Sequence, residues 1–239
     1  MIKTSSNIQE VYEFLAKNKG EMASHNIKEL TQWKKLLRQT KGQASSMLYE
    51  FKVGGNTCYS VRYVDGDATY YSNIIVVPFA NDKFQYIHWM GTFMSAFKYT
   101  SHFFDRYKER MNIKGSMKQA VKQYFKKART MACIYRKNGQ VVYTTDEGLV
   151  LGIENENMGM RIGCTFVDYT LLKHSQRAAF EKIQEVADAA RMKHLDLTDV
   201  GLSHQDATDV VSDEFQDARQ AAEEIYSWYF EEGDLKLRD

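Results

Sequence analysis

A histidine and two arginines recur at intervals of four in the segment SHFFDRYKER, residues 101–110. Four residues of an α-helix bring a side chain back to within about 40° of its starting direction. His102, Arg106 and Arg110 would therefore form one row along a helix. Arginine donates forked N–H groups to phosphate oxygens, and histidine carries a proton near neutral pH. Such a row has the groups that metal-independent RNA cleavage needs: a base for the 2′-OH proton and fixed positive charge for the phosphorane.

The acidic residues of the same segment favour a second interpretation. Asp105 and Glu109 alternate with the two arginines, as on an exposed helix whose charges pair with one another. Such pairs stabilise a helix by only about 0.2–0.5 kcal/mol each. The spacing alone is compatible with both interpretations, so other parts of the chain must decide between them.

Charge is unevenly distributed along a chain whose net charge is only +1. Twelve basic residues and two acidic ones lie between positions 96 and 137. Within this region Lys118 and Lys122 are candidate contacts for a polyanion such as RNA, and Tyr124 could stack on a base. A solvated lysine-rich helix face explains the same pattern. From position 196 onward thirteen acidic residues oppose three basic ones, which indicates either an exposed helical face or an acidic segment that shields the basic one.

Periodicity and turn residues predict the elements that must position these side chains. Capping pairs Ser6/Gln9 and Asn26/Glu29 begin two helices that end near Gly20 and Gly42. The following strands are expected at 46–53, 57–64, 68–79 and 84–90. A helix is expected over 92–111, either whole or broken near residues 100–101, and a second over 116–130. Four further strands are expected at 131–136, 140–145, 149–154 and 160–171, separated by turns that include Asn138-Gly139. Helices are then expected at 173–194, 203–211 and 212–233.

These elements predict an α+β protein. An N-terminal helix pair and antiparallel sheet occupy residues 1–95, a two-helix and four-strand module 96–170, and an acidic helical tail 171–239, as separate regions or one compact unit. The absence of a long apolar run argues against a membrane span, and the start of the chain lacks the apolar core of a signal peptide. Cys58, Cys133 and Cys164 form no ligand cluster, so we expect a cytoplasmic protein that uses no metal and no cofactor.

The segment SHFFDRYKERMNI resembles a short bacterial family of unknown function that is grouped with the barnase, EndoU, colicin and RelE-like ribonuclease superfamily. The family pattern has a histidine and two arginines at the positions of His102, Arg106 and Arg110, with acidic residues where this chain has Asp105 and Glu109. The chain departs from the pattern where Met111-Asn112 replaces a single glycine. It also resembles uncharacterised proteins of Bacteroidetes, which implies a bacterial source.

The resemblance covers residues 101–170 and implies a RelE- or barnase-like module with toxin-like, metal-independent endoribonuclease activity. His102 would be the proton carrier, and Arg106 and Arg110 would hold the phosphate. The strand GCTFVDY would place Thr165 in the substrate groove, and Tyr143 is a further groove candidate. RNA is then the expected partner, together with a protein that neutralises the activity. The alternative is a non-catalytic interaction protein of phage or mobile-element origin, in which the same row is a salt-bridged helix face.

Overall fold

The computed structural model describes residues 1–65, 68–90, 95–127, 132–137, 139–172 and 174–203, with short pieces at 206–207, 210–211 and 220. It divides the chain into two units. The first comprises residues 1–127 and 153–165, and the second residues 128–152 and 166–239. Strands β8 (Gly148–Asn155) and β9 (Met160–Asp168) contribute residues to both units. The expected α+β class is confirmed.

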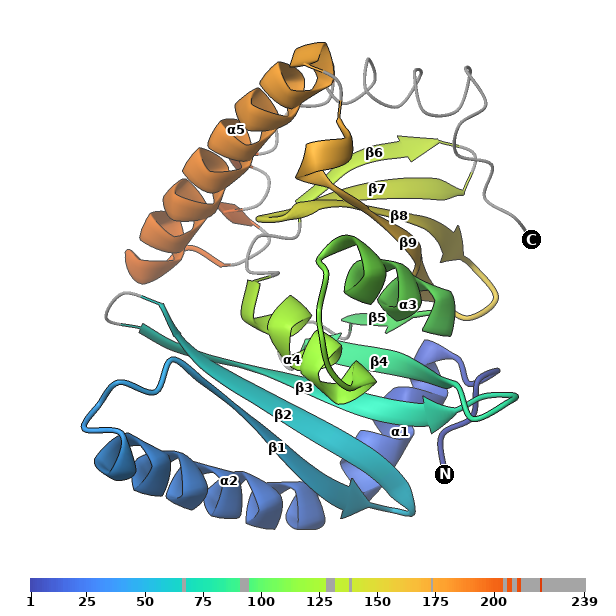
Figure 1. The fold of residues 1–239 in the computed structure, drawn as a ribbon, viewed down its shortest axis with the longest axis vertical. Coiled ribbons are helices and arrows are strands. Elements are labelled where there is room, and N and C mark those ends of the chain that lie inside the picture. Colours follow the sequence, from blue (N-terminus) through green and yellow to red (C-terminus); the bar gives the residue numbers. More distant parts are fainter. Residues whose placement is uncertain are drawn as a thin grey trace. The chain divides into compact units, whose positions relative to one another are not determined.

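The first unit contains two pairs of helices and a mostly antiparallel sheet (Figure 1). Strands β1 to β5 form a meander in chain order, and β9 then pairs in parallel with β5. The bounds are α1 Ile8–Lys17, α2 Lys19–Gln39, β1 Ser46–Val53, β2 Asn56–Asp65, β3 Ala68–Pro78, β4 Phe84–Met90, β5 Ser95–Tyr99, α3 Ser101–Arg110 and α4 Met117–Lys127.

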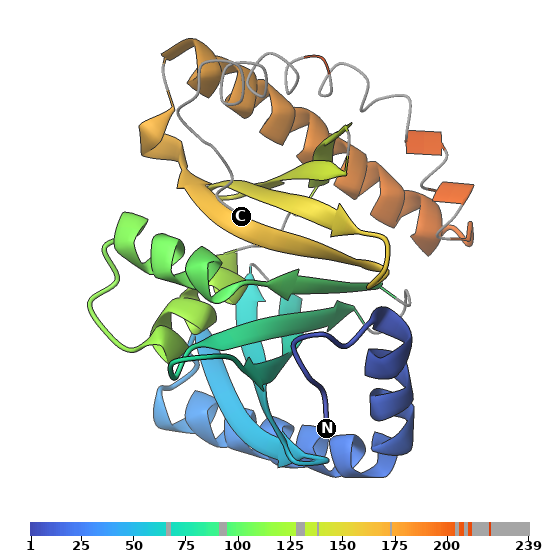
Figure 2. The ribbon, with the colours of Figure 1, turned by 90° about the vertical axis from the view of Figure 1, so that its right-hand side faces the viewer.

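Both faces of this sheet are covered, which explains the uninterrupted apolar run Ile74–Val77 in β3. Side chains alternate between the faces of a strand. Ile75 and Val77 join the apolar cluster that contains Val11 and Phe14 of α1. Helices α3 and α4 cover the opposite face, as Figure 2 shows. One row of strand residues thus anchors the N-terminal helices, and the other row supports the helices that carry the candidate site.

Aromatic side chains fill the space beneath α3 and α4. Tyr99 at the end of β5 lies 4.9 Å from Phe103 and 5.3 Å from Tyr124 between ring centroids. Tyr86 of β4 meets Phe104 edge-on at 4.7 Å. Such pairs add about 0.5–1.5 kcal/mol each beyond the burial of apolar surface. The two helices are therefore fixed on the sheet by ring packing.

The second unit contains β6 (Ala132–Lys137), β7 (Gln140–Thr145), the first part of β8 and the last part of β9. Strands β6 and β7 pair antiparallel across the turn at Gly139. The short 3₁₀ helix η1 (Tyr169–Leu171) follows β9, and α5 (His174–Asp199) is the long helix of this unit. The expected order of two helices followed by a four-strand meander is therefore present over residues 101–168.

Three sequence expectations need correction. Residues 95–99 form strand β5 rather than the first half of a helix, because this segment pairs with both β4 and β9. The capping box of α1 uses Asn7 and Glu10 instead of Ser6 and Gln9. Helix α2 starts at Lys19, well before the expected cap at Asn26, since Gly20 lies inside the helix and does not end one.

The unit boundaries also differ from the expected boundaries at 95/96 and 170/171. Helices α3 and α4 belong to the first unit, whereas β6 and β7 belong to the second. The helix expected at 212–233 lies outside the described residues except for residue 220. Within the described ranges, none of the helices has the length and apolar character required to span a membrane.

His88 in β4 predicts a specific pH dependence of folding. Its ring meets Phe125 of α4 at 4.9 Å, and loss of hydration lowers its pKa from 6.5 to about 4. The unfolded chain then takes up a proton below pH 6.5, whereas the folded chain resists protonation until about pH 4. This contribution to stability is complete above pH 6.5 and is lost as the pH falls towards 4.

The variant His88→Phe retains an aromatic ring but has no proton to gain. Between pH 7 and pH 4.5, urea unfolding should show that the wild type loses about 2 kcal/mol more free energy of unfolding than this variant. Equal losses in the two proteins would contradict a neutral, dehydrated His88 in the folded state.

Candidate functional site

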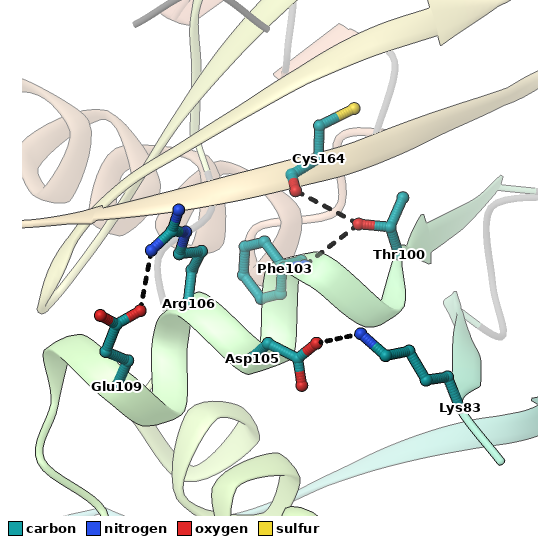
Figure 3. Close-up of polar contacts among 7 residues, drawn as sticks. All are labelled: Lys83, Thr100, Phe103, Asp105, Arg106, Glu109 and Cys164. Atoms are coloured by element: carbon teal, nitrogen blue, oxygen red, sulfur yellow. Dashed lines mark hydrogen bonds and ion pairs between the residues drawn. The ribbon is translucent and has the colours of Figure 1, made fainter. Parts of the chain in front are cut away.

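Helix α3 is fixed at its start by Thr100. The Thr100 hydroxyl accepts a hydrogen bond from the backbone N–H of Phe103 at 3.1 Å and donates one to the carbonyl of Cys164 in β9 at 3.2 Å (Figure 3). The backbone N–H of Thr100 also donates to the carbonyl of Gly163. Thr100 is therefore the N-cap of α3, and this cap joins the helix to the sheet.

The end of α3 has the two hydrogen bonds of a Schellman motif. The N–H of Ile113 donates to the carbonyl of Lys108, and that of Asn112 donates to the carbonyl of Glu109. Asn112 has a φ of 49°, in the left-handed region that favours glycine. Asparagine adopts this conformation more readily than most residues other than glycine.

Packing determines which side of α3 faces outward. Phe103, Phe104 and Tyr107 are completely buried against the sheet and α4. His102 is exposed on the helix, and Arg106 and Arg110 follow it in the row as half-buried side chains. The row expected from the four-residue spacing is therefore formed, and its histidine is not part of the core.

Two exposed ion pairs modify the charge of the row. The Arg106 guanidinium lies 2.9 Å from a Glu109 carboxylate oxygen, and the Lys83 ammonium lies 3.0 Å from Asp105 (Figure 3). The side chains of Arg106 and Glu109 are 43% and 66% exposed, so their attraction is screened by water. Exposed pairs contribute about 0–1 kcal/mol. An incoming phosphate could therefore replace Glu109 as the partner of Arg106 at low cost.

The charges around His102 favour its neutral form. Partial loss of hydration lowers its pKa from 6.5, and Arg106 lowers it further. Asp105 opposes this effect, while Lys83 and Arg110 add to it. Three cations therefore act on one accessible imidazole, which is unprotonated at neutral pH and able to accept a proton.

The basic residues of α4 are only partly available to a ligand. Lys118 lies 2.5 Å from Glu50 in β1 and over the ring of Tyr59, and Lys126 donates to the Ser45 hydroxyl. Burial and the neighbouring charge of Lys126 lower the pKa of Lys122. Lys122 thus lies in a positive environment, whereas the charge of Lys118 is balanced by a carboxylate.

Three other sequence candidates are core residues. Tyr124 is 1% exposed, and its hydroxyl donates to that of Tyr99, so its ring is not available to stack on a base. Tyr143 in β7 and Thr165 in β9 are 3% and 8% exposed. Burial of this degree argues against direct contact with a substrate. Sequence reasoning missed Lys83, whose place beside α3 depends on the pairing of β4 with β5.

Comparisons with protein-family models, with curated proteins and with solved structures found no match for this chain. Among the residues that the structure describes, no three His, Cys, Asp or Glu side chains are grouped so that they could hold a metal ion.

The cap at Thr100 can be tested by removing its hydroxyl. Thr100→Ala should lower the free energy of unfolding by about 1 kcal/mol, because α3 loses its cap. It should also speed hydrogen exchange at the Phe103 amide, because that N–H loses its hydrogen bond to the Thr100 hydroxyl. Thr100→Ser retains the hydroxyl and should behave like the wild type. An alanine variant with unchanged stability and exchange would show that the cap contributes nothing.

The electrostatic coupling in the row can be measured by histidine NMR. The pKa of His102 should lie below 6.5 in the wild type and rise in Arg106→Gln, because a lowering charge has been removed. Lys108→Gln is a matched control on the same helix, since Lys108 is not among the groups that shift this pKa. If both variants move the pKa equally, proximity to Arg106 is not the cause.

Proposed function

We propose that this protein binds RNA along α3 and cleaves it without a metal ion. The observation that carries the proposal is the accessible imidazole of His102, on which Arg106, Lys83 and Arg110 act together. A phosphodiester is attracted to such a group of cations, and a neutral imidazole within it is suited to accept a proton.

The proposed reaction is an internal transfer. Neutral His102 takes the proton of the ribose 2′-OH, and the 2′ oxygen attacks the adjacent phosphorus. The bond from phosphorus to the 5′ oxygen breaks, which leaves a 2′,3′-cyclic phosphate, and the departing 5′ oxygen receives a proton from the imidazolium or from water. Arg106, released from Glu109, stabilises the additional negative charge of the phosphorane, and Arg110 holds the strand one helical turn further on.

The sequence resemblance, which rests on the same histidine and arginines, agrees with this proposal. The family that resembles residues 101–170 is grouped with metal-independent ribonucleases, and the histidine and arginines of its pattern correspond to His102, Arg106 and Arg110. A toxin-like nuclease requires a neutralising partner, and we propose that a partner protein covers this row in the producing cell.

A second candidate function is non-catalytic interaction with another protein. The pairs Arg106–Glu109 and Lys83–Asp105 favour it, because a row whose charges are already balanced can be a solvated helix face. The two proposals differ in what His102 does: it accepts a proton in the first and has no chemical role in the second.

The experiment is an RNA cleavage assay with purified protein and a chelator that removes divalent ions. Several unstructured and folded RNAs should be tried, and one product should carry a 2′,3′-cyclic phosphate. His102→Ala should reduce the rate by about a hundredfold or more, as expected for loss of a general base. His174→Ala, which removes an exposed histidine of α5, should leave the rate unchanged.

Arg106→Gln should also lower the rate, through weaker stabilisation of the phosphorane. Wild-type protein that cleaves none of the RNAs, or that cleaves them no faster than His102→Ala, would refute the catalytic proposal. RNA binding without cleavage would leave only the binding part of it.

A further inference from the structure

The inner side of α2 is fixed against the sheet. Helix α2 runs along β1 (Figure 1), and its Met22 and Trp33 are 9% and 4% exposed. Glu29 is 2% exposed, and its two carboxylate oxygens accept hydrogen bonds from the Arg62 guanidinium of β2, both at 2.7 Å. These contacts leave the helix one rotation about its axis, so the residues of its outer side are defined.

The outer side of α2 is basic. The helix has five basic residues, all of them exposed: Lys19, Lys28, Lys34, Lys35 and Arg38. Its two acidic residues are engaged elsewhere. Glu29 is buried with Arg62, and Glu21 accepts a hydrogen bond from the backbone N–H of Gly54 in the turn between β1 and β2.

In the part of the chain that the structure describes, none of these five cations makes an ion pair or a side-chain hydrogen bond. By contrast, Lys83, Arg106 and Lys118 each have a carboxylate oxygen within 3.0 Å. Other exposed lysines without a partner, such as Lys3 and Lys114, are dispersed over separate segments. Helix α2 thus concentrates positive charge that the described residues do not neutralise.

Four of the cations form two adjacent rows along the helix. Lys34 and Arg38 are four residues apart, and Lys28 and Lys35 are seven apart, so the members of each pair point within about 40° of one another. From Lys28 to Arg38 the helix rises about 15 Å, which is long enough for one strand of a nucleic acid to place several phosphates along it.

A single edge strand separates this face from the helices of the candidate site. Strand β1 is at the end of the sheet, and its neighbouring residues Glu50 and Phe51 point to opposite faces. Glu50 contacts Lys118 of α4, whereas Phe51 stacks on His25 of α2 with ring centroids 4.8 Å apart. A polyanion held by α3 and α4 can therefore reach α2 by passing over β1.

The composition of this face favours a phosphate backbone over a lipid surface. An amphipathic helix that binds a membrane buries a broad apolar face at the headgroup boundary. The apolar side of α2 is already covered by the sheet, and Ile27 and Leu30 are the only large apolar side chains among its exposed residues. A cationic face with so little apolar surface is suited to a nucleic acid backbone, which attracts positive charge.

We propose that the outer face of α2 is a second binding surface for RNA, which holds phosphates of the strand away from His102 and takes no part in cleavage. This inference rests on the proposed function for the identity of the polyanion, because contacts to phosphates carry no base information of their own.

The test is binding of a labelled 2′-O-methyl RNA strand of about twenty nucleotides, which resists cleavage at its 2′ oxygens, to the full chain over a range of salt concentrations. Lys34→Gln together with Arg38→Gln should weaken binding about tenfold. The slope of log affinity against log salt should fall in magnitude by about 1.4, because each lost phosphate contact removes about 0.7.

Two controls separate this surface from general effects of charge. Lys3→Gln together with Lys182→Gln removes the same charge from exposed residues outside α2, and its affinity and slope should stay close to those of the wild type. Ile27→Gln changes the outer face of α2 without changing its charge, and it should bind RNA like the wild type. Binding to vesicles of phosphatidylserine and phosphatidylcholine is measured in parallel.

The surface would be wrong if the Lys34/Arg38 variant kept its affinity and slope while Arg106→Gln weakened binding, and the proposed function would then stand. An equal loss in the Lys3/Lys182 variant would also overturn it, since net charge would explain the effect. Vesicle binding that is lost in Ile27→Gln, with RNA affinity independent of Lys34 and Arg38, would make the face a membrane surface instead.

RNA binding that depends on α2, in a protein that cleaves no RNA, would support this surface and refute only the catalytic proposal. Wild-type protein that binds no RNA would overturn both.

Discussion

Ring packing beneath α3 determines how the rest of the site is presented. Phe103, Phe104 and Tyr107 are buried against Tyr99 and Tyr124, so the helix has only one rotation about its axis that keeps them in place. In that rotation the opposite side of the helix faces outward with its histidine and arginines. The Thr100 cap fixes the helix along its axis, because one hydroxyl joins the first turn to β9. The site thus depends on a core that carries none of its chemistry.

In the free protein, nearby groups of opposite sign partly neutralise the charges of α3. Glu109 pairs with Arg106, and Lys83 pairs with Asp105, but the four side chains are 41–66% exposed to water and their attraction is weak. A phosphate carries a full negative charge and matches the forked donors of arginine, so it competes well with a single exposed carboxylate. The same acids that favour a solvated helix therefore do not prevent anion binding. In the free protein, Asp105 and Glu109 also offset part of the positive charge around His102.

Local patterns predicted the α3 row, the four-strand meander after α4 and the overall class, because these depend on spacing and turn residues close in sequence. Strand β5 was missed, because residues 95–99 pair with β9 more than sixty positions later, and no local pattern encodes that contact. The role of Lys83 was missed for the same reason, since its position beside α3 depends on the pairing of β4 with β5. Tyr124 was misassigned although a signal existed: Val121, Tyr124 and Phe125 recur at helical spacing and form a buried face.

The central claim is that the row on α3 holds a phosphodiester next to His102. The most direct measurement is the pKa of His102 by NMR, in the free protein and in the presence of a saturating, uncleaved 2′-O-methyl strand. The account predicts that binding raises this pKa, because a bound phosphate offsets the cations that lower it. The pKa of His174 should not change. A strand that binds while the pKa of His102 stays where it was would contradict the account, since the phosphate would then lie elsewhere.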